Sequence, residues 1–450
     1  MVNLPNVAEP LLMSFSIAFT EPTYQRSLVL LVGAILAKGR HTITNLLWNV
    51  GNLAKGDPTD YHRVFSRAPW SLWKLGRVLA IAVIELAARD DWIRVVVDCT
   101  VAEHKGKKVY GKGCHHDAVR STDTHTAYRW GHRWVTLAVV IRFPFCSRPW
   151  ALPVSAALYR SEELNKKEQR RHKTPIQLAQ SLMAILLHWF PGKKFVLLGD
   201  GGYASHDLAR FCCRHRERLA LVSKFAPDGA LYAPPPPQKQ KSKVGRPRVR
   251  GKKLKTPEDV VAGSRLRRTR VSWYGASERQ VQVCEGRGQW YRGGAGLVPV
   301  HWVFVRDAEG TRRDEYFYTT HEHFTAEEVV TLYTLRWNLE VAFQELRAHL
   351  GFETPRQRVE KSVLRTAPCL LGLFSVISLI YNEHLKRHDA TTCDRPCYIK
   401  SEPTFSDAIA TVRRLFWQET ILAQPYFRKA CKNLPPKLQE FILDHFCQAT

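Results

Sequence analysis

Two short apolar runs, each ending in an aspartate, constrain the fold of this 450-residue chain more than any other feature. The first run is Ile93 to Asp98, and the second is Lys194 to Asp200 with Gly201-Gly202 directly after it. Short aliphatic and β-branched runs followed by a turn are typical of buried strands in an α/β sheet. Aspartates often follow strands only because they begin turns. Carboxylates at the carboxyl ends of strands, however, also lie where open α/β folds place their ligands.

A segment with helical spacing supplies a further candidate carboxylate. Residues 333–347 read YTLRWNLEVAFQELR. At about 100° of rotation per residue, four polar side chains of one continuous helix fall within roughly 60° of one another: Tyr333, Arg336, Glu340 and Arg347. Polar stripes often simply face water, but carboxylates bind hard cations and guanidinium groups bind phosphate oxygens. The stripe suits a site that holds a metal ion and a phosphodiester together. Glu345, about 140° around the helix, is the weaker alternative to Glu340.

These residues resemble the acidic triad of DDE-type transposases of bacterial insertion sequences. Asp98, Asp200 and Glu340 stand where that family has its three carboxylates. The resemblance is strongest to the subgroup with a Tyr-x2-Arg-x3-Glu-x6-Lys signature, which Tyr333, Arg336 and Glu340 match in spacing. Arg347 replaces the final lysine, which keeps the charge but changes the donor geometry. The likeness covers roughly residues 93–350.

The resemblance implies a fold, a cofactor and a reaction. The fold would be α/β, with a ribonuclease H-like mixed-sheet catalytic core, a β-rich insertion, and mainly helical regions at both ends. Asp98, Asp200 and Glu340 would bind two Mg²⁺ ions, or Mn²⁺, for hydrolysis at the ends of a mobile element and transfer of the 3′ ends to target DNA. Arg336 and Arg347 would hold phosphates, and Tyr333 would contact a phosphate or a displaced base. Synapsis of two DNA ends implies a homodimer.

Composition agrees with a nucleic-acid partner. The chain has 67 Lys and Arg against 41 Asp and Glu, a formal charge of +26. A chain this basic is attracted to nucleic acid, and less often to anionic membrane surfaces. We find no secretory signal, and the most apolar window, residues 367–381, predicts a buried core helix rather than a membrane span. The expected location is the cytoplasm of a bacterium, in association with the nucleoid, without a membrane partner.

Five regions follow from patterning and the resemblance. Residues 1–90 are predicted to form a helical, helix-turn-helix-like DNA-binding domain, although a structural helical bundle gives the same pattern. Its expected surface groups are Arg40, His41, His62, Arg63 and Arg67. Residues 91–224 would form the first part of the catalytic core, 225–312 a basic and β-rich insertion, and 313–350 the second part of the core with the Glu340 helix. Residues 351–450 would form a helical region with a role in dimerisation.

Basic segments near the predicted strands are candidates for contacts with DNA. Lys105, Lys107 and Lys108 follow the Asp98 strand, where they would neutralise a DNA backbone. Arg246 and Arg248 lie in a Gly-Arg-Pro-Arg sequence that resembles a minor-groove hook. The insertion also holds aromatic candidates for stacking on an unpaired base: Trp290, Tyr291 and Trp302. His132 is predicted to be structural rather than catalytic. Cys393 and Cys397 would be half a zinc site, but no second pair with suitable spacing follows.

Three other functions remain open at this point. A different ribonuclease H-like nuclease would not need the long insertion. A catalytically silent DNA-binding protein derived from a transposase would not need the triad. A basic scaffold that binds RNA or anionic lipid would leave the arrangement of Asp98, Asp200 and Glu340 unexplained, and would show no metal-dependent cleavage.

Overall fold

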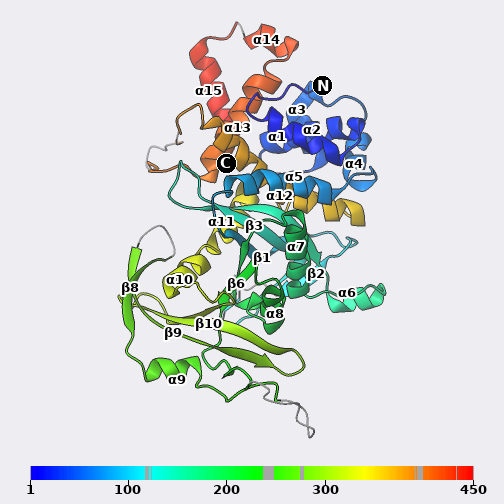
Figure 1. The fold of residues 1–450 in the computed structure, drawn as a ribbon. Helices are drawn as coiled ribbons and strands as arrows, with labels where there is room; N and C mark the ends of the chain where they lie inside the picture. The colour runs from blue at the N-terminus through cyan, green and yellow to red at the C-terminus, as the bar shows by residue number, and fades with distance from the viewer. Residues whose placement is uncertain are drawn as a thin grey trace. The chain divides into compact units, whose positions relative to one another are not determined.

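The computed structural model describes residues 2–116, 121–122, 124–236, 248–273, 278–390, 392, 399–431 and 433–448. The chain divides into two compact units that are interleaved along the sequence (Figure 1). The first unit contains Met1–Ala88, Cys99–Lys173 and Leu339–Thr450, and the second contains Arg89–Asp98 and Thr174–Asn338. Strand β1 (Ile93–Glu103) runs from the second unit into the first, so it contributes to both.

The second unit is built on a mixed sheet. Its strands lie in the order β1-β5-β6-β11-β10-β9-β7, and β8 pairs with β9 off this path. Strands β5 and β6 run parallel to β1, whereas the strands from β11 onward pair antiparallel. All residues of β5 are buried, which is why that segment reads as an uninterrupted apolar run. The bounds are β5 (Phe195–Gly199), β6 (Leu219–Lys224), β7 (Leu231–Tyr232), β8 (Arg267–Ser272), β9 (Glu278–Arg292), β10 (Gly296–Asp307) and β11 (Glu315–Thr319).

Two helices of the second unit begin at threonines that the sequence predicts as N-caps, because Thr174 is followed by Pro175 and Thr325 by Glu328 three residues later. Thr174 and Thr325 each form a capping box, in which the threonine hydroxyl accepts a bond from the backbone amide three residues later and that residue's side chain bonds back to the threonine amide. The capping boxes fix the starts of α7 and α10. The helices are α7 (Pro175–Trp189), α8 (His206–Arg214), α9 (Pro257–Ala262) and α10 (Ala326–Thr334), with a short 3-10 turn η3 (Gly201–Tyr203).

The continuous helix predicted over residues 333–347 is in fact divided between two helices. After α10 ends at Thr334, α11 (Trp337–His349) begins beyond a short break. In the break the amides of Leu335 and Arg336 bond to carbonyls three residues back, and the Asn338 side chain donates to the Leu335 carbonyl at 2.9 Å. A side-chain amide that takes a backbone carbonyl interrupts the regular hydrogen-bond ladder. The prediction of one continuous polar stripe was therefore wrong.

The first unit contains an antiparallel sheet. Strands β2 (Gly113–His116) and β4 (Trp150–Tyr159) pair antiparallel with β3 (Tyr128–Ile141), and β3 also neighbours β1. The sequence predicts strands at residues 134–142 and 150–158, which correspond to β3 and β4, but β3 begins at Tyr128 rather than at Trp134. Strand β1 was predicted to end at Asp98 and instead continues to Glu103. Its extension is explained by β3, which offers it a second partner after β5 has ended.

Helices from both ends of the chain complete the first unit. The N-terminal set is α1 (Glu9–Ser14), η1 (Phe15–Ala18), α2 (Glu21–Leu36), α3 (Ile43–Val50), η2 (Gly51–Leu53), α4 (Pro58–Ser66) and α5 (Leu72–Leu86). A short α6 (Glu162–Lys167) follows β4. The C-terminal set is α11, α12 (Glu360–His384), α13 (Phe405–Phe416), the π-helix η4 (Trp417–Ile421), α14 (Pro425–Cys431) and α15 (Pro436–Cys447). Helix α12 contacts α4, α5 and β4, and α13 contacts α2, so the two sets pack together.

One predicted surface residue of the N-terminal helices lies inside. Thr42 caps α3 as expected and accepts the Asn45 amide at 3.4 Å. The preceding His41, however, is only 3% exposed. Its ring nitrogens lie 3.1 Å from the Gly39 carbonyl and 3.0 Å from the Ala34 carbonyl, where they help to end α2. Burial lowers the pKa of His41, so the expectation that this side chain faces solvent was wrong.

Among the described residues, one helix, α12, has the length and apolar composition of a membrane span. In its most apolar window, 67% is buried inside the protein. Two serines in that window have partners, since Ser375 donates to the Pro153 carbonyl at 2.7 Å and Ser378 to the Phe374 carbonyl at 2.8 Å. The helix thus has the buried setting that the sequence predicts for residues 367–381.

The fold class is the one predicted. The core is a ribonuclease H-like mixed α/β arrangement with parallel strands β1, β5 and β6, an antiparallel β3–β4 pair, a strand-rich insertion, and helices at both ends.

Candidate active site

Two of the predicted carboxylates lie at the same edge of the second unit's sheet. Strands β1 and β5 are parallel, with Val97 opposite Gly199. Asp98 and Asp200 take the next position on each chain. Because neighbouring strands lie about 4.8 Å apart, the two carboxylates emerge close together. Oxygen donors in this arrangement suit a hard divalent cation such as Mg²⁺.

The turn after β5 fixes the position of Asp200. Its carboxylate accepts the Gly202 amide at 2.9 Å, and its carbonyl accepts the Ser223 hydroxyl at 2.9 Å. A Cβ at Gly199 would lie 2.7 Å from Cβ of Tyr203, and a Cβ at Gly202 would lie 3.1 Å from the Asp200 carboxylate. Close packing around this carboxylate therefore favours glycine at positions 199 and 202.

Arg336 lies beside Asp98 in the same unit. Its guanidinium is 3.4 Å from the Asp98 carboxylate, and the two side chains are only 11% and 14% exposed. The guanidinium also lies 5.8 Å from the ring centre of Tyr333. The Tyr333 ring is 2% exposed and packs against Phe317 with ring centres 4.3 Å apart. Arg336 thus neutralises a carboxylate that the sequence assigns to metal binding.

Glu340 and the alternative Glu345 both lie on α11, in the first unit. Glu340 is in the first turn of the helix and is partly buried. Glu345 is paired with His349 one turn later, at 3.2 Å. Glu345 therefore has a structural partner on its own helix. No set of three His, Cys, Asp or Glu side chains that could hold a metal ion occurs among the described residues. The approach of Glu340 to Asp98 and Asp200 stays a prediction.

Arg347 has several protein partners within the first unit. Its Nε donates to Glu353 at 3.0 Å, and its terminal nitrogens donate to the Thr100 hydroxyl and, at 3.3 Å, to the carbonyls of Val101 and Phe343. These bonds tie α11 to the part of β1 that follows Asp98 in the sequence. A phosphate-binding role for Arg347 stays a prediction, and it would require some of these bonds to break.

The predicted DNA-binding lysines are exposed. Lys105, Lys107 and Lys108 lie in the connection between β1 and β2, and all three face solvent. In the basic insertion Arg248 is exposed, whereas Arg246, like Cys393 and Cys397, lies outside the described residues. Exposed cations of this kind are available to a phosphate backbone.

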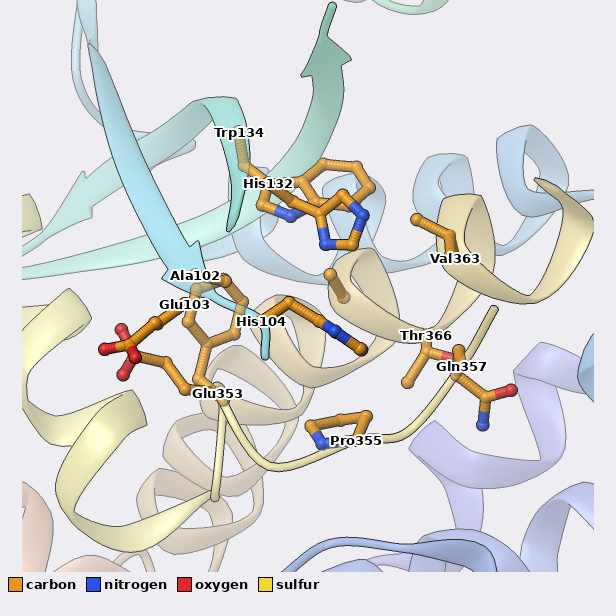
Figure 2. Close-up of a pocket in the computed structure, with 12 residues that line it drawn as sticks. Ala102, Glu103, His104, His132, Trp134, Glu353, Pro355, Gln357, Val363 and Thr366 are labelled. Carbon is orange, nitrogen blue, oxygen red and sulfur yellow. The ribbon is translucent and has the colours of Figure 1, made fainter. Parts of the chain in front are cut away.

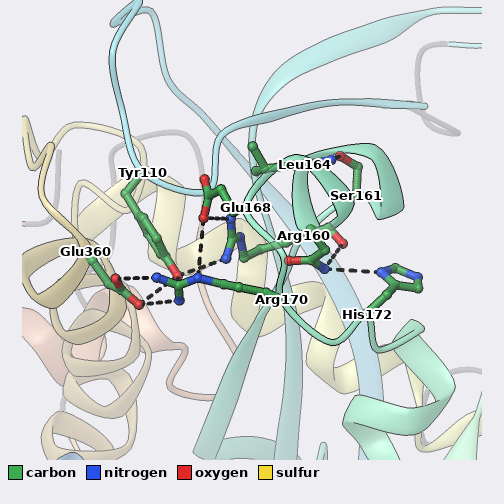
Figure 3. A network of polar contacts seen from close by, with 9 residues as sticks. Tyr110, Arg160, Ser161, Leu164, Glu168, Arg170, His172 and Glu360 are labelled. Carbon is green, nitrogen blue, oxygen red and sulfur yellow. Dashed lines mark hydrogen bonds and ion pairs between the residues drawn. The ribbon is translucent and has the colours of Figure 1, made fainter.

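A network of polar contacts lies around Tyr110, near the end of the connection between β1 and β2 (Figure 3). The Tyr110 hydroxyl donates to Glu360 at 2.8 Å and accepts from Arg160 at 3.2 Å and Arg170 at 2.9 Å. Arg170 also holds both carboxylate oxygens of Glu360, at 2.8 and 2.9 Å, and Glu168 pairs with both arginines. Because the two carboxylates balance the two guanidinium groups, the network is neutral and serves structure rather than phosphate binding.

The aromatic residues predicted to stack on DNA are engaged in packing. Trp302 is 3% exposed. Trp290 contacts His206, Phe225 and Tyr318 with ring centres 5.3–5.6 Å apart. The Tyr291 ring lies 4.6 Å from the Arg250 guanidinium.

Two exposed aromatic rings on β3 were not predicted from the sequence: Tyr128, which is 65% exposed, and Trp130, which is 59% exposed. The alternating pattern Tyr-Arg-Trp-Gly-His-Arg-Trp was the available signal, but the strand was predicted to begin only at its last residue.

A small pocket lies beneath β3 in the first unit. Figure 2 shows His132 and Trp134 on one side and His104 projecting toward Thr366 and Gln357. The cavity volume is about 40 Å³, enough for water but not for a nucleotide. Burial, followed by the charge of His132 and of nearby arginines and Lys112, lowers the pKa of His104 to about 4. Nε2 of His132 donates to the Tyr110 carbonyl at 2.9 Å, which gives His132 the structural role predicted for it.

Comparisons with known proteins identify the superfamily of this chain. A family model described as "DDE superfamily endonuclease" matches residues 14–280, more than half of the chain, and includes Asp98 and Asp200. The chain therefore belongs to the DDE endonuclease superfamily. A second model, described as "Archaeal putative transposase ISC1217", matches residues 253–370, which include Glu340. The expected DDE identity is confirmed at the level of the superfamily.

Among solved structures, the chain is similar to a piggyBac transposase in a synaptic complex with hairpin DNA determined by cryo-EM. The two share 10% identity with a TM-score of 0.41, and the match covers 98% of this chain and 80% of that one. No curated protein matches the chain.

Proposed function

We propose that this chain is a DNA transposase that binds the ends of a mobile element, cleaves there by metal-dependent hydrolysis and joins the freed 3′ ends to target DNA. The observation that carries the proposal is the pair of carboxylates, Asp98 and Asp200, on adjacent parallel strands of a DDE-family core. The bacterial insertion-sequence subgroup is proposed from the Tyr333, Arg336 and Glu340 spacing, with Arg347 in place of its lysine.

The carboxylates of Asp98 and Asp200, at the ends of adjacent strands, have the chemistry of ligands for a divalent metal. Asp98, Asp200 and Glu340 would hold Mg²⁺, or Mn²⁺, and the bound metal would supply an activated water and stabilise the leaving 3′ oxygen. In the first step the water oxygen attacks the phosphorus, the bond to the 3′ oxygen breaks, and a 3′-hydroxyl results. In the second step that hydroxyl attacks a phosphodiester of the target, whose own 3′ oxygen leaves. The turn at Gly201-Gly202 holds the Asp200 carboxylate in place through both steps.

Arg336 would change partners during the reaction. It is held within 3.4 Å of Asp98 in this structure. A metal that takes Asp98 as a ligand would supply the positive charge that Arg336 now provides, and the guanidinium would turn to a DNA phosphate. The same movement would explain why an arginine and a metal ligand share a poorly exposed site.

The remaining assignments rest on charge and on resemblance. The formal charge of +26 and the exposed Lys105, Lys107 and Lys108 would attract DNA to the core. We also propose that residues 1–90 contact DNA, that the chain acts as a homodimer in the synaptic complex, and that it works in the cytoplasm at the nucleoid.

Cleavage of supercoiled plasmid that carries the element's ends tests the proposal. Wild-type protein with Mg²⁺ or Mn²⁺ is expected to nick or excise at the ends. Asp98→Ala, Asp200→Ala and Glu340→Ala should bind the plasmid but cut more slowly by at least about 100-fold, since loss of even outer metal-site partners costs 10–100-fold. Glu345→Ala is the matched control and should still cut.

Two outcomes would change the assignment. If the wild-type protein binds the ends and neither metal supports cleavage, a silent DNA-binding protein derived from a transposase replaces the enzyme. If Glu340→Ala cuts and Glu345→Ala does not, the third carboxylate is Glu345.

A further inference from the structure

The outer face of the β2–β3 hairpin carries exposed aromatic side chains. Residues alternate across a strand, and the register pairs Cys114 with Trp130 and His116 with Tyr128. All four side chains therefore point to one face, and all four are exposed, with Tyr128 at 65% and Trp130 at 59%. Exposed rings that are adjacent on one face of a folded protein indicate a binding surface rather than a core.

Positive charge borders this face. Nζ of Lys112 lies 5.5 Å from the ring centre of Trp130 and is fixed by a bond of 2.6 Å to the Gly106 carbonyl. The exposed Lys105, Lys107 and Lys108 come from the same connection. An aromatic face bordered by cations is complementary to a polyanion whose flat rings are unpaired. A neutral or cationic protein surface would not match it.

The two rings offer separate stacking surfaces. Side chains two residues apart on a strand are about 6.7 Å apart, so each exposed ring is available to a base by itself. The Tyr128 ring also lies edge-on to His116, with ring centres 6.2 Å apart. Bases within a duplex are covered on both faces by their stacked neighbours, so only unpaired bases can stack on these rings.

The support beneath the face is rigid. Gly131 lies against β1, where a Cβ would come within 2.1 Å of the Ala102 carbonyl. The His104 amide bonds to the Trp130 carbonyl at 3.0 Å. His132 and Trp134, the next two residues on the same side of β3, are 6% and 1% exposed. Rings held on a fixed strand lose little freedom when a ligand stacks on them.

We propose that the β2–β3 face, defined by Tyr128, Trp130, His116 and Lys112, binds unpaired bases of the DNA substrate. The proposal deepens and rests on the transposase function, and it assigns base stacking to the core rather than to Trp290, Tyr291 or Trp302 of the insertion. The unpaired bases would belong to a DNA strand opened at an end or at the target.

Fluorescence anisotropy with the full-length chain tests this surface. The probes are a fluorescein-labelled oligothymidylate and a fully paired duplex of the same length, at one fixed salt concentration. Trp130→Ala and Tyr128→Ala should each weaken binding of the oligothymidylate by about 5- to 150-fold, the range expected for loss of one stacked base. Duplex binding should change by less than about twofold. Trp130→Phe should restore most of the loss. Tyr426→Ala removes an equally exposed ring, at 75%, and is the control.

Three outcomes would overturn the proposal: unchanged oligothymidylate binding, equal weakening of both probes, or conversion of a dimer to a monomer in light scattering without a selective loss. Thermal unfolding of each variant should match the wild type, because the replaced rings are exposed.

Plasmid cleavage separates this proposal from the proposed function. If the wild type cuts and Trp130→Ala binds unpaired DNA normally, the proposal of a stacking surface is wrong and the proposed enzymatic function still stands. If the wild type does not cut but the selective loss occurs, only the enzymatic function fails.

Discussion

At the scale of single residues, the contact between Arg336 and Asp98 is a feature that the spacing of these residues in the sequence could not predict. The sequence pattern gave both residues a functional role, one toward phosphate and one toward metal. The structure places them 3.4 Å apart, with little exposure of either side chain. Because an arginine and a metal ion compete for the same carboxylate, the contact predicts a link between metal affinity and stability.

Arg336→Met should destabilise the protein by about 2–3 kcal/mol, since it removes one partner of a mostly buried ion pair. The variant should also bind Mn²⁺ or Mg²⁺ more tightly than the wild type, because its Asp98 is no longer neutralised. Thermal unfolding across a metal titration measures both effects. Metal should raise the unfolding temperature of Arg336→Met more than that of the wild type, and it should have no effect on Asp98→Ala. An equal rise for the wild type and Arg336→Met would contradict the competition.

Position 351, which follows α11, requires a glycine because of its backbone conformation and because of the atoms that surround it. Its φ is +54°, and a Cβ there would lie 2.3 Å from Nδ1 of His41 and 2.8 Å from the Gly39 carbonyl. Gly351→Ala should therefore cost about 2–4 kcal/mol, from left-handed strain together with overpacking. Gly192→Ala, at a position with nothing within 4 Å, is the matched control and should be close to neutral. Chemical denaturation of both variants measures the difference, and similar midpoints would exclude this explanation.

At the scale of elements, β8 is held to the start of α10 by one charged pair. Arg267 bonds to Glu327 at 2.6 Å, and this bond is the main reason that the pKa of Glu327 is lowered to about 2. Glu327 also lies in the first turn of α10, where a negative charge is favourable. The pair thus predicts how the stability of this insertion depends on pH.

A carboxylate with a lowered pKa in the folded state stabilises the protein above its unfolded pKa, and this stabilisation is lost as pH falls toward the folded pKa. For Glu327 the window runs from about pH 4.5 down to about 2. Arg267 is half exposed, so we expect about 1 kcal/mol rather than the full value of the shift. Glu327→Gln should remove this part of the pH dependence of unfolding, whereas Glu258→Gln, an exposed carboxylate on α9, should not. If the free energy of unfolding depends on pH in the same way for the wild type and Glu327→Gln, then Glu327 is not the group responsible.

The elements themselves were largely predictable, and the exceptions have physical causes. The apolar runs before Asp98 and Asp200 identify strands correctly, because buried parallel strands leave continuous apolar sequence. The continuation of β1 to Glu103 depends on pairing with β3, a contact distant in sequence. The break before α11 depends on the Asn338 side chain, and helical periodicity cannot report it. Of the site, the two aspartates were predictable, but the Asp98–Arg336 pair was not.

A buried arginine joins two helices of the first unit. Arg413 on α13 is 1% exposed and donates to the Ile35 carbonyl at 2.8 Å and to the Ala37 carbonyl at 3.1 Å, at the end of α2. Arg413→Met should destabilise the protein by about 3 kcal/mol, because carbonyls at a buried helix end lose their donors. The neighbouring Arg414→Met removes only exposed pairs and should cost less than about 1 kcal/mol. Urea unfolding of both variants compares them, and equal costs would show that Arg413 is not a capping group.

At the scale of the whole molecule, the first unit is assembled from both ends of the chain. Arg365 on α12 donates to four carbonyls at the end of α4 and in the turn after it: those of Val64, Phe65, Ala68 and Trp70. Arg413 does the same for α2. Helices α2 and α4 belong to the region 1–90 that is predicted to contact DNA, and their C-terminal ends are completed by residues more than 290 positions later. The N-terminal region is therefore part of a larger folded body rather than an independent reading module.

This dependence predicts that residues 1–88 do not fold when they are expressed alone. The isolated fragment lacks the donors of Arg365 and Arg413 and exposes the apolar faces that pack on α12 and α13. Short helices without such tertiary contacts are marginal in water. Circular dichroism of the fragment should show little helix and no cooperative melting, and the fragment should not bind the element's ends, whereas the full chain should do both. A fragment that melts cooperatively and binds the ends would establish an independent DNA-binding domain and would assign the two arginines to docking rather than to folding.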